Sequence, residues 1–229
     1  SLGATVEGEG TPTIRVTCRD IRSWEPDASL VETPRGSVLL LGALLGRTGR
    51  AELAPPGGDF PARRTISTHV HALSAMGARV VEDAAGHRLE APEGLTGCSV
   101  YLLEASVTGT ETAMLGAAQA RGVTEIRHAA CEPHVAELAS FLAAMGARVD
   151  GIGTSTVRIE APGRLRGATH TLRGDYIEAA SWGVVGATTC GEVEVIGPAR
   201  TDLEPIVTVL GQMGLDHDLD EGRFVVRPT

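Results

Sequence analysis

Apolar residues recur with helical spacing in three stretches of the chain, and each stretch is followed by a short run that alternates like a strand. The helical stretches are "GSVLLLGALLGRTG", "TETAMLGAAQARG" and "IEAASWGVVGATTCG", and the strands are "RAELA", "TEIRHA" and "EVEVIG". The first helix is apolar on nearly every side over residues 37–45, so we expect it to be buried inside a domain.

A second helix follows each of these pairs and ends at a glycine. The three endings are "LSAMGARV", "LAAMGARV" and "LGQMGLDH", in which Gly77, Gly146 and Gly214 occupy the position where a left-handed residue closes a helix. The spacing is about seventy residues, longer than the repeats of solenoid proteins, so the repeated unit is a whole supersecondary module.

Two strand candidates follow each glycine, such as "RVVED" with "HRLEA" and "RVDGI" with "TVRIEA". A further strand, "GCSVYLLEA" or "GATHTLRG", leads into the next module. The sequence therefore predicts an α/β (α+β) fold of repeated βαβαββ modules, with helices inward and sheets outward around a pseudo-threefold axis. The opening "SLGATV" matches only the end of a module, so we expect the first module to be incomplete.

The composition argues against several classes of function. The 229 residues are 42% hydrophobic and carry a formal charge of −9, which argues against an extended nucleic-acid surface. All 20 basic residues are arginine, so the chain offers no Schiff-base or phosphate-loop lysine. The sequence shows no membrane span or secretory signal, and we expect a cytoplasmic protein.

The metal-binding residue types are scattered. The four cysteines are far apart and form no Cys-x-x-Cys pair, so we expect buried free thiols: Cys18, Cys98, Cys131 and Cys190. His69 and His71 point to different faces of a helix, and Cys131 with His134 lacks further ligands. The sequence predicts no metal and no cofactor.

The segment "PPGGDFPARR", residues 55–64, is a loop because its prolines and glycines are incompatible with a helix or an inner strand. It nevertheless carries a carboxylate, Asp59, and two guanidinium groups, Arg63 and Arg64. Loops often bear functional residues, although a solvated turn with incidental charges is the alternative.

Several short motifs, in this order on this repeat, resemble the enolpyruvyl transferases. The resemblance is greater to the UDP-N-acetylglucosamine 1-carboxyvinyltransferases than to the EPSP synthases, and it covers nearly the entire chain. The matching residues are Pro34-Arg35-Gly36-Ser37, Pro56-Gly57-Gly58-Asp59 with Arg64, Ala105-Ser106-Val107, Glu132-Pro133 and Asp175-Tyr176-Ile177-Glu178.

The resemblance implies a pair of inside-out α/β domains that close on a cleft. It assigns residues 1–173 to the domain that bears the lid and residues 174–229 to the first returning module of the second domain. The family's N-terminal Lys-Asn pair and its second-domain catalytic Asp have no counterpart here. We therefore expect a fragment, a shortened homologue, or half of a two-chain enzyme whose cleft a second chain completes.

The resemblance also implies the chemistry, which is transfer of the enolpyruvyl group of phosphoenolpyruvate to a hydroxyl of UDP-N-acetylglucosamine or a related nucleotide. Arg35 and Arg64 are expected to grip the two anionic groups of phosphoenolpyruvate, since guanidinium groups bind phosphate and carboxylate bidentately. Asp59 is expected to donate a proton or to assist product release. The remaining expected substrate contacts are Ser106, Val107, Glu132 and Asp175.

The sequence also departs from the family pattern around the nucleotide-sugar pocket. Thr68 and Glu104 stand where the family has a leucine and a lysine, and Thr108 where it has a glycine. A carboxylate beside a diphosphate is unfavourable, so a nucleoside monophosphate or another sugar is an alternative acceptor. His69 matches a family histidine, but we favour a packing role for it.

Two other functions stay open. One is a catalytically silent homologue that binds a nucleotide sugar or a partner chain. The other is a sugar-phosphate isomerase or hydrolase that uses Asp59, Glu132 and Asp175 as acid and base.

Overall fold

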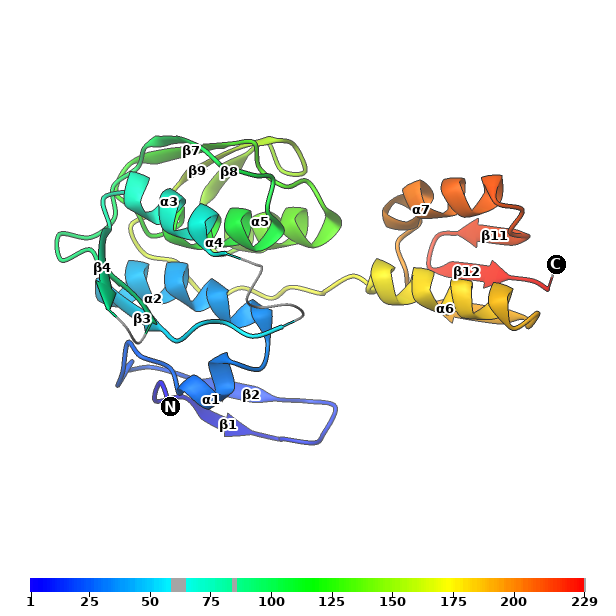
Figure 1. Ribbon diagram of the computed structural model, residues 1–229, viewed down its shortest axis with the longest axis horizontal. Coiled ribbons are helices and arrows are strands. Elements are labelled where there is room, and N and C mark those ends of the chain that lie inside the picture. The colour runs from blue at the N-terminus through cyan, green and yellow to red at the C-terminus, as the bar shows by residue number, and fades with distance from the viewer. Residues whose placement is uncertain (59–64, 84–85, 229) are drawn as a thin grey trace. The chain divides into compact units, whose positions relative to one another are not determined.

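The computed structural model describes residues 1–58, 65–83 and 86–228. The chain forms two compact units, Ser1–Thr169 and His170–Thr229 (Figure 1). Among the described residues, none of the helices combines the length and the apolar character that a membrane crossing requires.

The first unit holds five α-helices and nine strands in the described ranges, and a 3₁₀ turn, η1 (Arg35–Leu39), precedes the second helix. The helices are α1 (Ala28–Val31), α2 (Leu40–Thr48), α3 (Ser67–Ala75), α4 (Val107–Ala117) and α5 (Pro133–Ala144). The strands are β1 (Thr5–Glu7), β2 (Arg15–Thr17), β3 (Arg50–Leu53), β4 (Arg79–Asp83), β5 (Gly86–Glu90), β6 (Ser99–Tyr101), β7 (Val123–Arg127), β8 (Arg148–Asp150) and β9 (Thr156–Glu160).

The second unit repeats the same kind of module. Its elements are α6 (Tyr176–Thr188), β10 (Val193–Ile196), α7 (Arg200–Gln212), β11 (His217–Asp220) and β12 (Arg223–Val226). Its small core is built from α6, α7 and β12. A Cβ on Gly183 of α6 would come within 2.5 Å of the Phe224 ring. Glycine at this position therefore lets the helix approach the sheet closely.

The sheets confirm the predicted repeat. Their strand orders are β3-β5-β4, β6-β7-β9-β8 and β10-β12-β11, so the last strand of each module lies in the middle of its sheet. The pairs within a module are antiparallel, with Val80 opposite Leu89 and Val149 opposite Ile159, whereas β6 runs parallel to β7. The short strands β1 and β2 pair only with each other among the described strands.

Helices α2–α5 of the first unit lie inside and the sheets β3-β5-β4 and β6-β7-β9-β8 outside, as predicted (Figure 1). Helix α4 is central and packs against α2, α3 and α5, and eight of its eleven residues are buried. A Cβ on Gly42 would lie 2.4 Å from the Thr112 carbonyl oxygen, so glycine allows α2 to pack directly on α4. The predicted burial of residues 37–45 is confirmed at Val38, Leu41, Leu44 and Leu45.

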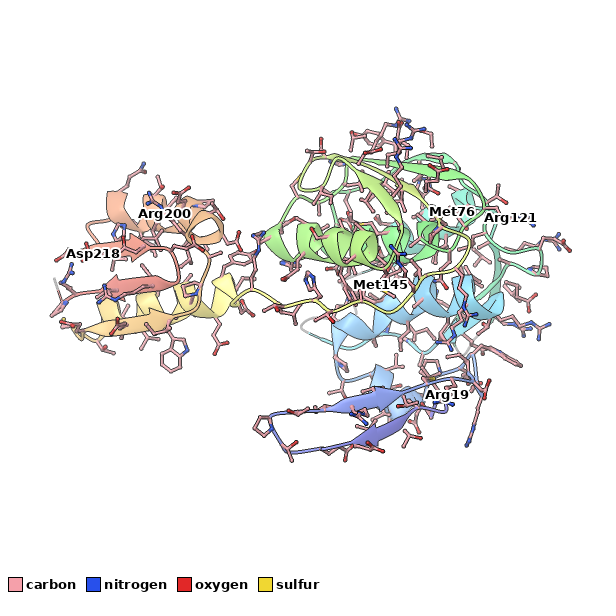
Figure 2. The ribbon with its side chains drawn as sticks, turned by 180° about the vertical axis from the view of Figure 1, so that it is seen from behind. Arg19, Met76, Arg121, Met145, Arg200 and Asp218 are labelled. Carbon is pink, nitrogen blue, oxygen red and sulfur yellow. The ribbon has the colours of Figure 1, made fainter. Side chains whose placement is uncertain are left out.

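The predicted helix-ending glycines are also confirmed. Gly77, Gly146 and Gly214 have φ of +97°, +106° and +95°. Each follows a methionine that closes its helix, and Met76 and Met145 are labelled in Figure 2. The left-handed conformation is open to glycine because it has no Cβ.

The predicted strand "GATHTLRG" is wrong. Residues 167–174 are all described and form no strand, and the sheet of the second unit begins with β10. Leu172, its largest apolar side chain, is 75% exposed, so neither burial nor a neighbouring strand holds this segment in a sheet.

The prediction of buried thiols is wrong as well. All four cysteines belong to the described part of the chain and are free, but Cys131 and Cys190 are exposed and Cys18 and Cys98 are half-buried. Cys131 follows β7 in a connection and Cys190 follows the end of α6, and side chains in such connections lie at the surface.

Candidate functional site

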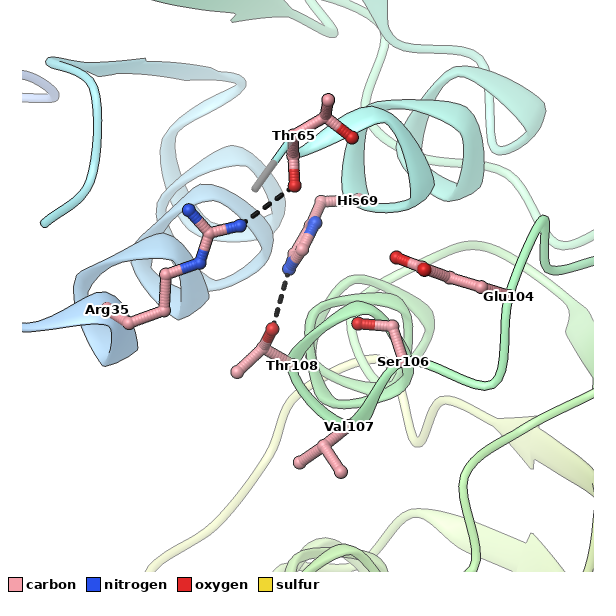
Figure 3. Close-up of a pocket in the computed structure, with 7 residues that line it drawn as sticks. All are labelled: Arg35, Thr65, His69, Glu104, Ser106, Val107 and Thr108. Atoms are coloured by element: carbon pink, nitrogen blue, oxygen red, sulfur yellow. Dashed lines mark hydrogen bonds between the residues drawn. The ribbon is translucent and has the colours of Figure 1, made fainter. Parts of the chain in front are cut away.

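A pocket of about 610 Å³ lies in the first unit, where η1, the start of α3 and the start of α4 converge (Figure 3). Its lining residues are Arg35, Thr65, His69, Glu104, Ser106, Val107 and Thr108. Three of the predicted site residues, Arg35, Ser106 and Val107, therefore meet in one cavity. The volume of this pocket is typical of sites that bind small molecules.

Arg35 occupies one side of the pocket. It is the first residue of η1 and follows Pro34, which is extended with φ −97° and ψ 141°. Its Nη2 atom donates a hydrogen bond of 2.8 Å to the Thr65 carbonyl oxygen. This bond joins η1 to the segment that enters α3, so the guanidinium group is held at the pocket wall.

The described start of the 55–64 loop packs against the backbone on either side of Pro34. The Gly57 amide donates to the Val31 carbonyl oxygen at 3.2 Å, and a Cβ on Gly57 would lie only 1.9 Å from the Glu32 carbonyl oxygen. Gly58 has φ +93°, and its Cβ would meet the Arg35 Cβ at 2.9 Å. Only glycine fits this approach, which brings the loop beside Arg35.

His69 forms the centre of the pocket wall on α3. Its side chain is 2% exposed, and its Nε2 atom shares a hydrogen bond of 2.9 Å with the Thr108 hydroxyl on α4. The expected packing role is therefore combined with a place in the pocket. Spacing along the chain could not reveal this pair, because the two residues are 39 positions apart.

The first turn of α4 forms the remaining wall. Ser106 caps the helix, and its hydroxyl accepts a hydrogen bond of 3.2 Å from the Gly109 amide. A Cβ on Gly109 would lie 2.9 Å from the Thr68 methyl, so glycine allows α3 to approach α4 here. Thr68 in turn donates a hydrogen bond of 3.3 Å to the Glu104 carboxylate.

Two predicted substrate contacts lie elsewhere. Glu132 is the residue before α5 and does not line this pocket. Asp175 belongs to the second unit, where it caps α6 by accepting hydrogen bonds from the Ile177 and Glu178 amides at 2.9 and 3.1 Å. That contact gives Asp175 a structural role in starting the helix.

The predictions for the loop itself fall outside the structure's description. Asp59 and Arg64 both lie in the 59–64 gap between the described ranges. Their assignment to the site stays a prediction from the sequence.

Among the described residues, metal-ligating side chains do not gather at the pocket. His71 shares a hydrogen bond of 3.1 Å with the Tyr101 carbonyl oxygen, whereas its neighbour His69 bonds to Thr108. Within residues 1–58, 65–83 and 86–228, no group of three His, Cys, Asp or Glu side chains could hold a metal ion.

A buried carboxyl lies one turn after Val107 on α4. Glu111 is 9% exposed. Burial raises the pKa of its carboxyl above the ordinary value, because a charged group loses its hydration there. The charge of Glu132 acts in the same direction, whereas His134 acts against it.

Replacing Glu111 with Gln is expected to increase the free energy of unfolding near pH 7 by on the order of 1 kcal/mol, which raises the midpoint of thermal unfolding by a few degrees. The pKa of the Glu111 carboxyl is higher in the native protein than its ordinary value of 4.5. The protonated carboxyl therefore makes its full contribution to stability below pH 4.5, and this contribution is lost as the pH rises through the native pKa. The gain from Gln should therefore shrink below that value. Circular dichroism melts across this pH range measure the difference.

The exposed Glu93, on the turn after β5, provides the matched Glu-to-Gln control. It should change the midpoint little at either pH. A Glu111 variant whose effect is the same near pH 4 and pH 7 would contradict a penalty from ionisation.

The sequence comparisons match the chain to a known family. The profile of EPSP synthase (3-phosphoshikimate 1-carboxyvinyltransferase) matches residues 1–228. Two curated relatives are UDP-N-acetylglucosamine 1-carboxyvinyltransferases, from Bradyrhizobium diazoefficiens at 41% identity and from Solibacter usitatus at 40% identity. Each match covers 94% of this chain and 49% or 51% of the relative, so the chain spans about half the length of these proteins.

Solved structures show the same fold. The enolpyruvyl transferase NikO from Streptomyces tendae matches with a TM-score of 0.83 at 24% identity, over 100% of this chain and 55% of that one. EPSP synthase from Acinetobacter baumannii matches with a TM-score of 0.66 at 18% identity, over 98% of this chain and 53% of that one. With the profile match over nearly its whole length, the chain belongs to the EPSP synthase family of enolpyruvyl (carboxyvinyl) transferases.

Proposed function

We propose that the protein takes part in transfer of the enolpyruvyl group from phosphoenolpyruvate to a hydroxyl of UDP-N-acetylglucosamine or a related nucleotide, with release of phosphate. The observation that carries this proposal is the pocket in which Arg35 faces the capped start of α4, in a chain of this family. It offers one cation for an anionic substrate, with Ser106, Thr108 and Glu104 on the opposite wall.

The reaction adds the acceptor O–H across the double bond of phosphoenolpyruvate. The acceptor oxygen bonds to the carbon that carries the phosphate, and the methylene carbon takes up a proton. Loss of phosphate and of a proton from that methyl group then restores the double bond. Acid and base groups within hydrogen-bond reach of both reactants are required for these proton transfers.

Arg35 suits the phosphoenolpyruvate side of the pocket, since a planar guanidinium group binds phosphate or carboxylate in a bidentate way. Arg64 and Asp59 complete this side in the proposal. Support for their place comes from the sequence motif and from the described loop start, because Gly57 and Gly58 bring the chain directly against residues 32–35. A loop that closes here would exclude water from the reacting groups.

Ser106, Val107 and Thr108 suit the acceptor side, where hydroxyl and backbone groups can hydrogen-bond to a sugar. Asp175 and Glu132 remain proposed contacts from the sequence motif alone. Because this chain spans about half of its relatives' length, the proposed cleft includes a further chain or segment beyond the residues described here.

The test is an assay of phosphate release by the full chain with phosphoenolpyruvate and, in separate reactions, UDP-N-acetylglucosamine or UMP, alongside calorimetric titration with phosphoenolpyruvate. Substrate-dependent phosphate release supports the transferase. Binding of phosphoenolpyruvate without release would instead favour a catalytically silent homologue. Failure to bind phosphoenolpyruvate at all would contradict the role assigned to the pocket.

A further inference from the structure

Glu104 places a carboxylate on the wall of the pocket that is proposed to bind the acceptor. Figure 3 shows its carboxylate on one side of His69 and the Arg35 guanidinium group on the other. The Thr68 hydroxyl donates to Glu104 from α3 at 3.3 Å, so the carboxylate is held by a neighbouring element. Thr68 itself is 1% exposed, which fixes the position of this donor.

The start of α4 would ordinarily attract an anion, because the first amides of a helix carry partial positive charge. Here the side chain of Ser106 already accepts from the Gly109 amide. Glu104 lies two residues before this cap and lines the same pocket, so the chain supplies its own negative charge at this end of the helix. A ligand phosphate in the same place would be repelled by the carboxylate.

A carboxylate accepts hydrogen bonds and donates none when it is ionised. The neighbouring Ser106 and Thr108 hydroxyls can donate or accept, so the wall as a whole matches a group rich in hydroxyl or amine donors. The cis-diol of a nucleoside has this chemistry, whereas a diphosphate offers only acceptors and carries charge of the same sign as Glu104.

We infer that Glu104 determines acceptor selectivity: the pocket binds the diol of a nucleoside or nucleoside monophosphate against Glu104 and selects against an acceptor that places a diphosphate there. This inference rests on the proposed function, because it assigns this wall to the acceptor. Between the two acceptors of the proposed function, it favours the related nucleotide without a diphosphate over UDP-N-acetylglucosamine.

The experiment is calorimetric titration of the full chain with uridine, UMP and UDP, for the wild type and for Glu104→Gln and Glu104→Lys. In the wild type, the second phosphate should bring no gain in affinity. In Glu104→Gln, UDP should bind on the order of tenfold more tightly relative to uridine, and in Glu104→Lys more tightly still. Glu93→Gln, an exposed carboxylate away from the pocket lining, is the matched control and should behave like the wild type.

The inference would be overturned if affinity depended on the number of phosphates equally in the wild type and in both Glu104 variants. It would also be overturned if none of the three proteins bound uridine, UMP or UDP. Glu104 is exposed, so its replacement should leave the fold intact, and a thermal melt of each variant checks this. The series contains no phosphoenolpyruvate. A failure here therefore leaves the proposed transfer chemistry to be judged separately by phosphoenolpyruvate binding and phosphate release.

Discussion

Replacing Arg35 with alanine is expected to weaken phosphoenolpyruvate binding about 10- to 100-fold, because a charge-assisted hydrogen bond contributes roughly 1.5–3 kcal/mol. Arg35 lines the pocket, and its hydrogen bond to the Thr65 carbonyl oxygen holds the guanidinium group beside α3. Removing it takes the cation from this wall. Calorimetric titration with phosphoenolpyruvate measures the loss.

Two further variants separate the charge from its geometry. Arg35→Lys keeps the charge but loses the bidentate fork, so its affinity should fall between those of the wild type and Arg35→Ala. Arg121→Ala removes an exposed arginine outside the pocket lining, labelled in Figure 2, and should bind like the wild type.

The Arg35→Ala variant also loses its bond to Thr65, so thermal melts must accompany the titrations. A variant that keeps the wild-type melting temperature but binds less tightly supports a direct contact with the anion. Unchanged affinity in a folded Arg35→Ala protein would remove Arg35 from the proposed site.

Replacing Gly57 with alanine is expected to destabilise the first unit by about 3 kcal/mol or more, since overpacking that displaces backbone typically costs 1–3 kcal/mol and occasionally exceeds this. The added Cβ would lie 1.9 Å from the Glu32 carbonyl oxygen and 2.7 Å from that of Thr33. Both atoms belong to the backbone just before Arg35, so they cannot rotate away as a side chain would. Urea unfolding followed by circular dichroism measures the change.

Gly167 provides the matched glycine-to-alanine control. A Cβ there would meet no atom within 4 Å, and its φ lies outside the left-handed range, so Gly167→Ala should be neutral or slightly stabilising. A Gly57→Ala protein with the wild-type midpoint would show that the loop start does not press against residues 32–33. If the clash is relieved by movement of residues 32–35, phosphoenolpyruvate affinity should fall together with stability.

Local chemistry in the sequence was enough to predict the repeated module. The spacing of apolar residues marked the central helices, strand-like runs after each helix-ending glycine marked strands such as β4 and β5, and glycine marked the helix ends at 77, 146 and 214. These features depend on residues that are near one another in the chain, and the same pattern recurs in each module. The resemblance to a family then added Arg35, Ser106 and Val107, which the structure brings into one pocket.

The contacts that build the pocket could not be read from spacing. Arg35 reaches Thr65 across 30 positions, His69 reaches Thr108 across 39, and Thr68 reaches Glu104 across 36. The first pair joins η1 to the segment that enters α3. The other two form because α3 and α4 pack closely, and Gly109, which has no side chain, permits that approach.

Burial and pairing outside the modules also depended on the tertiary structure. The segment 167–174 has strand-like residues but no neighbouring strand in the described chain, and Cys131 and Cys190 are exposed because their connections lie at the surface. The sequence by itself determined the helices and strands of the repeated module, their order along the chain and the candidate chemistry. Packing decided which distant side chains face one cavity, since that depends on how close the helices can approach rather than on the order of residues along the chain.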